Sequence, residues 1–316
     1  MKTIKELKIA LAEILHADGI NMKLYLGTAE SENREYKLAD FDDGATESVC
    51  QQFIGSIDQF FLGEDLATHS LSQMDHRADT LYMYDFEEVP AEFAKISGLL
   101  IGNEPDLFTF DNNALSRVTS LAIKISSAQK SVIFFKKFYP VSLVKRDQIL
   151  LIVNANTRFA LLDKDVLKVT GGFELLLLDD EFYINNFEKF EKSFSFDRIA
   201  KNAMTKVANK ILALDMVVDS KGYLSAGTAS RKDVLRAGAS RVLDMDKNLI
   251  IAFAIQKQHQ IGLKVINGKF QLNSRESIKK LYKLLNDDYL MSELTNVEYE
   301  TLAKNELEAT PNEGDA

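Results

Sequence analysis

Residues 130–196 read KSVIFFKKFYPVSLVKRDQILLIVNANTRFALLDKDVLKVTGGFELLLLDDEFYINNFEKFEKSFSF, and this stretch decides the fold of the chain. It consists of short runs rich in β-branched and aromatic residues, separated by turn-forming residues such as Asn154-Ala155-Asn156 and Gly171-Gly172. The runs predict strands over 132–138, 148–153, 158–162, 166–170, 173–178 and 181–184. The stretch therefore predicts a meander of largely antiparallel strands, which is followed by a long helix.

The run 173–178 predicts the centre of the sheet. Its sequence, FELLLL, is almost continuously apolar, which is typical of a strand covered on both faces. Asp179-Asp180 follows it directly and predicts a tight turn into the next strand, 181–184.

The segments on either side complete an α+β chain. Residues 1–129 form an acidic, mixed region, with helices predicted over 1–19, 47–61 and 90–100, a hairpin of 22–27 with 35–38, and a strand over 80–84. After the sheet, we expect a helix from Asp197, as its N-cap, to Val217. A short helix capped by Thr228 or Ser230 follows, and Gly238 marks either its end or a tight turn before a second helix. A strand over 248–255, a hairpin of 261–266 with 269–272 closed by Asn267-Gly268, and a helix over 275–285 capped by Ser274 follow.

These elements predict three parts of the chain. We expect an acidic α+β region over 1–125, a second α+β domain with packed helices over 126–302, and a disordered acidic tail over 303–316. The tail lacks an apolar pattern, and no linker rich in Pro, Gly or Ser separates the first two parts.

Charge is distributed unevenly along the sequence. The net charge is −9, and residues 1–129 carry 10 basic and 22 acidic side chains. Residues 188–280 reverse this balance, with 18 basic and 9 acidic side chains. The local electrostatic field, more than the net charge, decides what docks on a surface. This basic segment therefore indicates a polyanionic partner in spite of the negative net charge.

The helix after the sheet carries the clearest cationic pattern. Between Arg198 and Leu214 it has no acidic residue, and its polar arc presents basic, amide and hydroxyl groups, which are the groups that bind phosphate. A solvated face that happens to lack Glu is the alternative. The candidate DNA-contacting cations in this helix and the segment after it are Arg198, Lys201, Lys206, Lys210, Lys221, Arg231, Lys232, Arg236 and Arg241.

Signals for catalysis or cofactor binding are few. The only cysteine, Cys50, excludes an intramolecular disulfide, fits a reducing cell interior and is expected to be a small buried residue. His69 and His76 flank Asp75 and could supply metal ligands, but nothing nearby completes a set. No phosphate-binding loop, dinucleotide-binding loop or nucleophile elbow is found, and neither Glu174 nor Glu181 continues to the lysine of a nuclease-type Glu-x-Lys. We therefore predict no catalytic residue, metal or cofactor.

Three features of the sequence resemble the domain-of-unknown-function family that is typified by KwaB, the soluble subunit of the bacterial Kiwa anti-phage defence system. They are FELLLLDDEFYINNFEKFEKSFSFD (173–197), the cationic helix behind it, and the INGKF hairpin (266–270) with KKLYKLLNDDYL (279–290). The resemblance implies a cytoplasmic protein that forms a dimer or higher homo-oligomer, binds DNA and is recruited to the inner membrane by a partner subunit, KwaA.

Three functions are compatible with these observations. The leading hypothesis is a DNA-binding defence effector that acts by occupying phage DNA without sequence preference. The alternatives are a metal-dependent nuclease whose site is assembled from distant residues, and a non-catalytic adaptor whose basic surface docks on an acidic protein.

Overall fold

The computed structural model describes residues 2–30, 33–61, 66–74, 79–102, 104–109, 117–138, 143–144, 152–155, 158–161, 166–167, 171–224, 226–291 and 298–300. The chain forms two compact units. The first comprises residues 1–71 and 78–199, and the second comprises residues 72–77 and 200–316. Within the described residues, no helix is long and apolar enough to cross a membrane.

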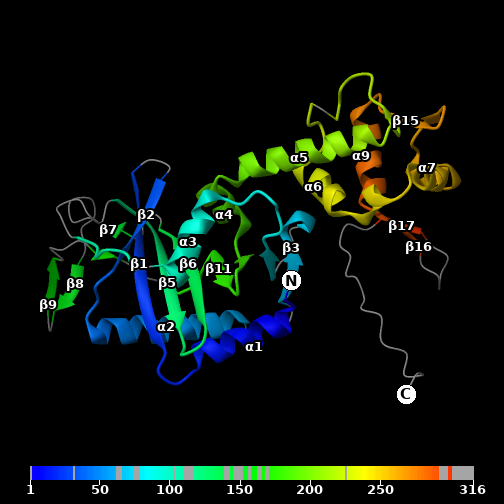
Figure 1. The fold of residues 1–316 in the computed structure, drawn as a ribbon. Coiled ribbons are helices and arrows are strands. Elements are labelled where there is room, and N and C mark those ends of the chain that lie inside the picture. Colours follow the sequence, from blue (N-terminus) through cyan, green and yellow to red (C-terminus); the bar gives the residue numbers. More distant parts are fainter. Residues whose placement is uncertain are drawn as a thin grey trace, which may run out of the picture. The chain divides into compact units, whose positions relative to one another are not determined.

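The first unit is built on an eight-stranded sheet with the order β2-β1-β5-β6-β11-β12-β4-β3 (Figure 1). Every neighbouring pair is antiparallel except β3 and β4, which are parallel, so the predicted α+β class with a largely antiparallel sheet is confirmed. The strands are β1 (Asn21–Glu30), β2 (Asn33–Leu38), β3 (Ala67–Ser70), β4 (Thr80–Met83), β5 (Val118–Ser126), β6 (Ser131–Lys137), β11 (Leu175–Leu178) and β12 (Glu181–Ile184).

The predicted central strand is confirmed. All four residues of β11 are buried, and the strand pairs with β6 on one side and β12 on the other. Asp179 and Asp180 connect β11 to β12 with φ values of 49° and 61°, the left-handed conformation that both central residues of a type I′ hairpin turn require. Short polar Asp side chains tolerate that conformation better than most residues do, which explains why two of them close this hairpin.

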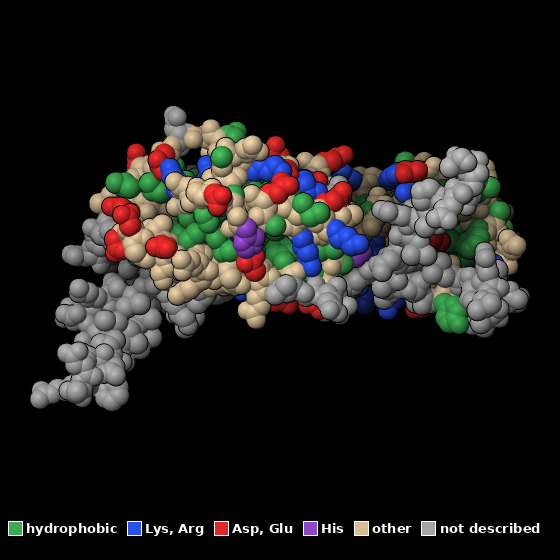
Figure 2. Space-filling view, turned by 90° about the horizontal axis from the view of Figure 1, so that it is seen from below, with side chains coloured by type: hydrophobic (Ala, Val, Ile, Leu, Met, Phe, Trp, Pro, Cys, Tyr) green, Lys and Arg blue, Asp and Glu red, His purple; other side chains and the backbone are tan. Residues whose placement is uncertain are grey.

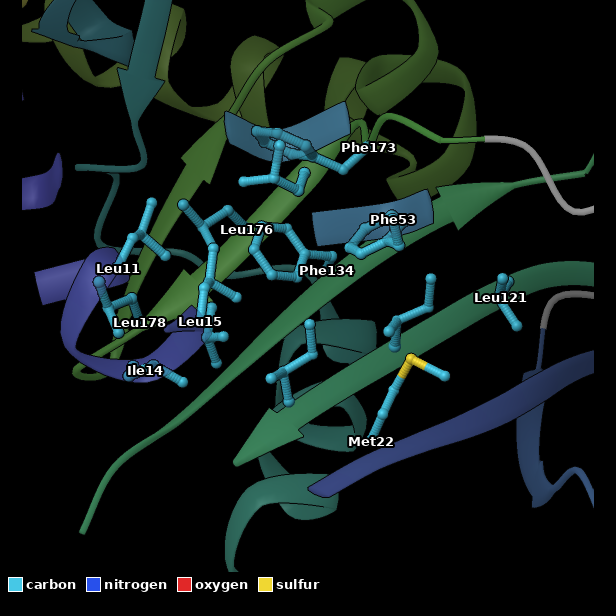
Figure 3. Close-up of a cluster of buried hydrophobic side chains, with 14 of the residues drawn as sticks. Leu11, Ile14, Leu15, Met22, Phe53, Leu121, Phe134, Phe173, Leu176 and Leu178 are labelled. Carbon is cyan, nitrogen blue, oxygen red and sulfur yellow. The ribbon is translucent and has the colours of Figure 1, made fainter. Parts of the chain in front are cut away.

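Helices cover both faces of the sheet (Figure 1). On one face lie α1 (Ile4–Leu15), which begins with a capping box between Thr3 and Glu6, and α2 (Asp43–Phe61). On the other face lie α3 (Ala91–Ile101) and α4 (Phe187–Phe194). Figure 3 shows how side chains of α1 and α2 meet those of the strands in the core, among them Leu11, Ile14, Leu15, Phe53, Phe134, Leu176 and Leu178.

The opposite face of the sheet is filled by aromatic side chains. The rings of Phe93 and Phe182 stack with centroids 3.8 Å apart, and Phe135 of β6 contacts Phe194 of α4 at 5.0 Å. Offset-stacked and edge-on pairs of this kind stabilise a core by about 0.5–1.5 kcal/mol beyond their buried area. They hold β12 against α3 and β6 against α4.

Two predictions about the sheet are wrong. Strands β7 (Leu143–Val144), β8 (Ile152–Ala155), β9 (Arg158–Leu161) and β10 (Val166–Leu167) do not continue a meander but form two separate pairs, β7 with β10 and β8 with β9. The expected boundary near residue 125 is also absent, because β5 ends there in the middle of the sheet and pairs with β1 and β6. The two compact units divide instead after Ile199.

The second unit packs helices around a three-stranded sheet, β13-β15-β14. Its buried core includes Ile211, Leu243, Ile250, Phe270, Leu281 and Leu285. The elements are α5 (Phe196–Ala213), which starts in the first unit, β13 (Val217–Val218), α6 (Arg231–Ala239), a 3-10 turn (Arg241–Asp244), α7 (Lys247–Gln256), α8 (Gln258–Ile261), β14 (Val265–Ile266), β15 (Lys269–Gln271), α9 (Arg275–Leu285), and the pair β16 (Tyr289–Met291) and β17 (Glu298–Glu300).

Local capping signals in this unit are confirmed. Ser274 accepts a hydrogen bond from the Ser277 N–H at the start of α9, and Ser230 accepts one from the Asp233 N–H at the start of α6. Asn267 and Gly268, at φ 50° and 69°, close the predicted β14–β15 hairpin. The segment 303–316 lies outside the described residues.

Two elements differ from the sequence prediction, one in its type and one in its boundaries. The predicted strand 248–255 is the helix α7, which Asp246 caps by accepting a hydrogen bond from the Asn248 N–H at 2.7 Å. A continuous apolar run does not by itself distinguish a strand from a partly buried helix, and the cap decides the case. Helix α5 begins at Phe196, after Ser195 in the left-handed conformation, so Asp197 lies in its first turn and is not the N-cap; the helix ends at Ala213.

The sequence offers Gly238 as the end of α6. In the structure Gly238 lies inside α6, at a close contact with α5. A Cβ atom at this position would lie 2.5 Å from Cγ2 of Val207, a distance that real Cβ contacts do not show. The missing side chain therefore lets the two helices approach, at the cost of a residue with poor helix propensity.

Replacing Gly238 with Ala is expected to lower the melting temperature. Overpacking against Val207 costs about 1–3 kcal/mol, which exceeds the gain of about 1 kcal/mol from helix propensity. The matched control is Gly98→Ala in α3, where the added Cβ meets no atom within 4 Å and the same propensity gain should raise stability. Equal stabilisation of both variants in thermal unfolding would show that α5 and α6 can separate without cost.

Candidate nucleic-acid interface

Helix α5 separates a buried face from a cationic one. Ile199, Val207 and Ile211 are buried in the core, whereas Lys201, Lys206 and Lys210 are exposed. The spacing of apolar residues by three or four positions produces this division, and the helix carries no acidic residue after Asp197. Three lysines and the side chains of Asn202, Thr205 and Asn209 thus share the solvent side of one rigid element.

Two of the helix cations form exposed ion pairs. Nζ of Lys210 lies 2.6 Å from Oδ1 of Asp244, and the two side chains are 46% and 69% exposed. Arg198, which belongs to the first unit, pairs with Glu88. Exposed pairs of this kind contribute only about 0–1 kcal/mol, so a phosphate group can replace the carboxylate at little cost.

The candidate cations after α5 are placed by a loop and by α6. Lys221 is exposed in the loop that follows β13, and Arg231 and Lys232 are half-buried in the first turn of α6. Arg241 is exposed at the start of the 3-10 turn, whose N-cap is Ser240. All four belong to the second unit, as do Lys201, Lys206 and Lys210.

Arg236 differs from the other candidates because the structure buries it. Its side chain is 9% exposed, and Nη2 donates a hydrogen bond to Oδ1 of Asp288 at 3.0 Å. Asp288 is itself 1% exposed, so the pair lies in the interior of the second unit. A guanidinium in this position cannot reach a DNA backbone, and we remove Arg236 from the candidate contacts.

Charge elsewhere is more evenly balanced. On the face drawn in Figure 2, Lys and Arg side chains are interspersed with Asp and Glu side chains. In the first unit several lysines pair directly with carboxylates, such as Lys23 with Glu104 at 2.6 Å and Lys130 with Glu13 at 2.7 Å. The run of cations without acidic neighbours in sequence is a property of α5.

The structure gives no support to a metal site among the residues that it describes. No group of three or more His, Cys, Asp or Glu side chains in this part of the chain is arranged to hold a metal ion. His69 lies in β3, but Asp75 and His76 fall outside the described residues, so the predicted pair of ligands cannot be placed. Cys50 is buried, as expected, and burial raises the pKa of its thiol, which makes it a poor nucleophile at neutral pH.

Sequence reasoning identified the exposed cations but missed their partners. Asp244 lies 34 positions after Lys210, and Asp288 lies 52 positions after Arg236, so neither pairing has a signal in local spacing. An apolar neighbourhood was the one available sign for Arg236, since Val234, Leu235 and Ala237 around it are all buried.

Comparison with known proteins identifies the family. The family model described as "Kiwa protein KwaB-like" matches residues 115–295, more than half of the chain. The chain belongs to the KwaB-like family of Kiwa proteins. The KwaB-like match begins just before β5 and includes the whole cationic segment from Arg198 to Arg241.

The relationship extends beyond the region of the family model. Kiwa protein KwaB of Escherichia coli O55:H7 (strain RM12579 / EPEC) is 26% identical over 319 residues, which cover 97% of this chain and 99% of that protein. No solved structure matches the chain. The similarity to KwaB thus includes the N-terminal strands and helices of the first unit.

Proposed function

We propose that this KwaB-like protein is an anti-phage defence effector that binds DNA through phosphate contacts from the solvent side of α5. The observation that carries the proposal is the placement of Lys201, Lys206 and Lys210 on one exposed face of a helix that has no acidic residue beyond its first turn. The contacts that we propose are these three lysines together with Lys221, Arg231, Lys232 and Arg241. Arg198 joins them only by exchanging Glu88 for a phosphate, and it is therefore a peripheral contact.

The chemistry of this face favours binding without sequence preference. Lysine ammonium groups act as point charges that attract any phosphate, whereas reading of bases in the major groove relies on bidentate pairs from Arg, Asn or Gln at fixed positions. Affinity from such contacts comes mainly from the release of counterions that are condensed on DNA, so it depends steeply on salt. We therefore propose that the protein acts by occupying phage DNA.

The family resemblance supplies the cellular setting of the proposal. It implies that the protein acts in the cytoplasm, associates with itself and is recruited to the inner membrane by the subunit KwaA. In this arrangement the partner supplies the membrane attachment and the KwaB-like chain supplies the DNA contact. The proposal requires no catalytic residue and no cofactor.

The dependence of affinity on salt tests the proposal. Replacing Lys206 and Lys210 with Gln is expected to reduce the slope of log affinity against log salt by roughly 2, because each lost phosphate contact removes about 0.9 from the slope on duplex DNA. Fluorescence anisotropy with a duplex of random sequence, measured between low and physiological salt, provides both affinity and slope. Sequence preference should stay unchanged.

The control for this test is Lys23→Gln together with Lys130→Gln in the first unit. This control removes the same number of positive charges. Both lysines are partly exposed and paired with carboxylates, so the slope of log affinity against log salt should not change. An unchanged slope in the Lys206 and Lys210 variant would remove these contacts from the mechanism. Binding to an acidic protein in place of DNA would then support the adaptor alternative, and cleavage of plasmid DNA with Mg²⁺ or Mn²⁺ would support the nuclease.

A further inference from the structure

A cavity of about 260 Å³ lies beside the cationic face, entirely within the second unit. One wall is the stripe Lys201, Thr205 and Asn209, whose spacing by four residues places them on one side of α5. The opposite wall is formed by Tyr223, Leu224, Ala226, Gly227 and Ala229, and the buried ring of Tyr282 from α9 contributes to the lining.

The loop wall is held in place by its own hydrogen bonds. The carboxylate of Asp219 accepts hydrogen bonds from the N–H groups of Tyr223 and Leu224, each at 2.8 Å. The hydroxyl of Thr228 donates to the carbonyl oxygen of Tyr223 at 2.9 Å. Because these bonds fix both ends of the loop, the cavity is formed in the chain without a ligand.

Small residues keep the cavity open. Ala226, Gly227 and Ala229 line it, and a Cβ added at Gly227 would meet no atom within 4 Å. Gly227 also has a φ of 62°, a conformation that other residues seldom adopt. These three small residues thus leave the space beside α5 unfilled.

The lining combines apolar and aromatic surface with a few polar groups. Met204, Leu224 and Val234 provide apolar contacts, and Tyr223 and Tyr282 provide aromatic rings. Tyr282 is 2% exposed. Burial and the nearby Asp233 raise the pKa of Tyr282 to about 12, so at neutral pH the hydroxyl keeps its proton and can act as a donor.

We infer that this cavity binds a single nucleobase that carries a phosphate group. The volume lies just below the range of about 300–1,000 Å³ that drug-sized ligands occupy, which suits one planar base. Aromatic and apolar walls accept the faces of a base, the amide of Asn209 offers a donor and an acceptor to its edge, and Lys201 lies where a phosphate would follow. The base could belong to single-stranded DNA or to a free nucleotide.

This inference extends the proposed function, because an unpaired base in the cavity would let the cationic face hold single strands as well as duplex. Calorimetric titration of the full chain with dAMP, the single strand dA12 and a duplex tests it. Ala226→Leu, which fills the cavity from an exposed position, should weaken dA12 and dAMP binding at least tenfold and leave duplex binding within twofold. The matched control, Ala252→Leu on the exposed side of α7, should change none of the three.

A second variant guards against a folding defect. Asn209→Leu removes the amide from an exposed helix position, and it should weaken dA12 and dAMP binding with an unchanged melting temperature. If dA12 binds much more tightly than dAMP, the base comes from a strand; if dAMP alone binds, the source is a free nucleotide. Duplex binding without any effect of Ala226→Leu and Asn209→Leu on dA12 or dAMP overturns the inference and leaves the proposed function standing. If the unmodified protein binds dAMP but no DNA, and Ala226→Leu loses dAMP binding, the proposed function is overturned and the inference about the cavity stands.

Discussion

Reversing the charge of Lys201 and Lys206 is expected to weaken duplex DNA binding by at least about sixtyfold at 0.1 M salt. With a slope of about 0.9 for each phosphate contact, one contact makes the affinity at 0.1 M salt about eight times higher than at 1 M salt. The factors for two lost contacts are multiplied. Glu at both positions also adds repulsion. Neither side chain is part of the α5 core, so the double variant should keep the melting temperature of the unmodified chain, and anisotropy measures the affinity.

The matched control reverses two lysines of another helix. Lys5→Glu with Lys8→Glu on α1 changes the net charge by the same amount in the first unit and should leave DNA affinity nearly unchanged. Equal losses in both double variants would mean that net charge alone governs binding. Full affinity in the α5 variant would show that α5 is a solvated face.

Replacing Arg236 with Met is expected to destabilise the second unit by about 3–5 kcal/mol, because it leaves the carboxylate of Asp288 buried without its cation. Asp288 is 1% exposed, so water cannot take over the role of the guanidinium. Urea unfolding followed by circular dichroism measures the loss. Since small domains are stable by only about 5–15 kcal/mol, part of the chain should unfold near body temperature.

Two further variants separate the pair from its charge. Arg236→Met combined with Asp288→Leu replaces the ion pair by apolar side chains and should recover most of the stability. Lys210→Gln, which breaks the exposed pair with Asp244, should cost less than about 1 kcal/mol. A chain with Arg236→Met that melts normally but binds DNA weakly would return Arg236 to the interface.

Local signals in the sequence predicted much of the fold. The run Leu175–Leu178, the turn at Asp179-Asp180, the Asn267-Gly268 hairpin and the Ser274 cap each act within a few residues, and all were confirmed. The strand predicted over 248–255 failed because a uniformly apolar run has no periodicity, and the deciding cap at Asp246 lies outside the run.

Long-range pairings could not be predicted in the same way. The sequence does not indicate that β5 returns to β1, or that β12 pairs with β4, because strand neighbours are chosen by packing of the whole sheet. The same limit applies to the site: helical spacing predicted which face of α5 is exposed, but the burial of Arg236 depends on a partner 52 positions away. The contacts themselves stay predictions until DNA binding is measured.

The strand order affects the sequence of events during synthesis. Strands β3 and β4 are among the first to leave the ribosome, but Tyr82 of β4 pairs with Ile184 of β12, so this edge of the sheet must wait for more than half of the chain. A nascent chain that ends near residue 125 contains β1, β2 and β5 in one group and β3 and β4 in another. The strands that join these two groups in the finished sheet have not yet been made. Such a high contact order slows folding and exposes strand edges in the meantime, which makes this stage the one most prone to aggregation and most in need of chaperones.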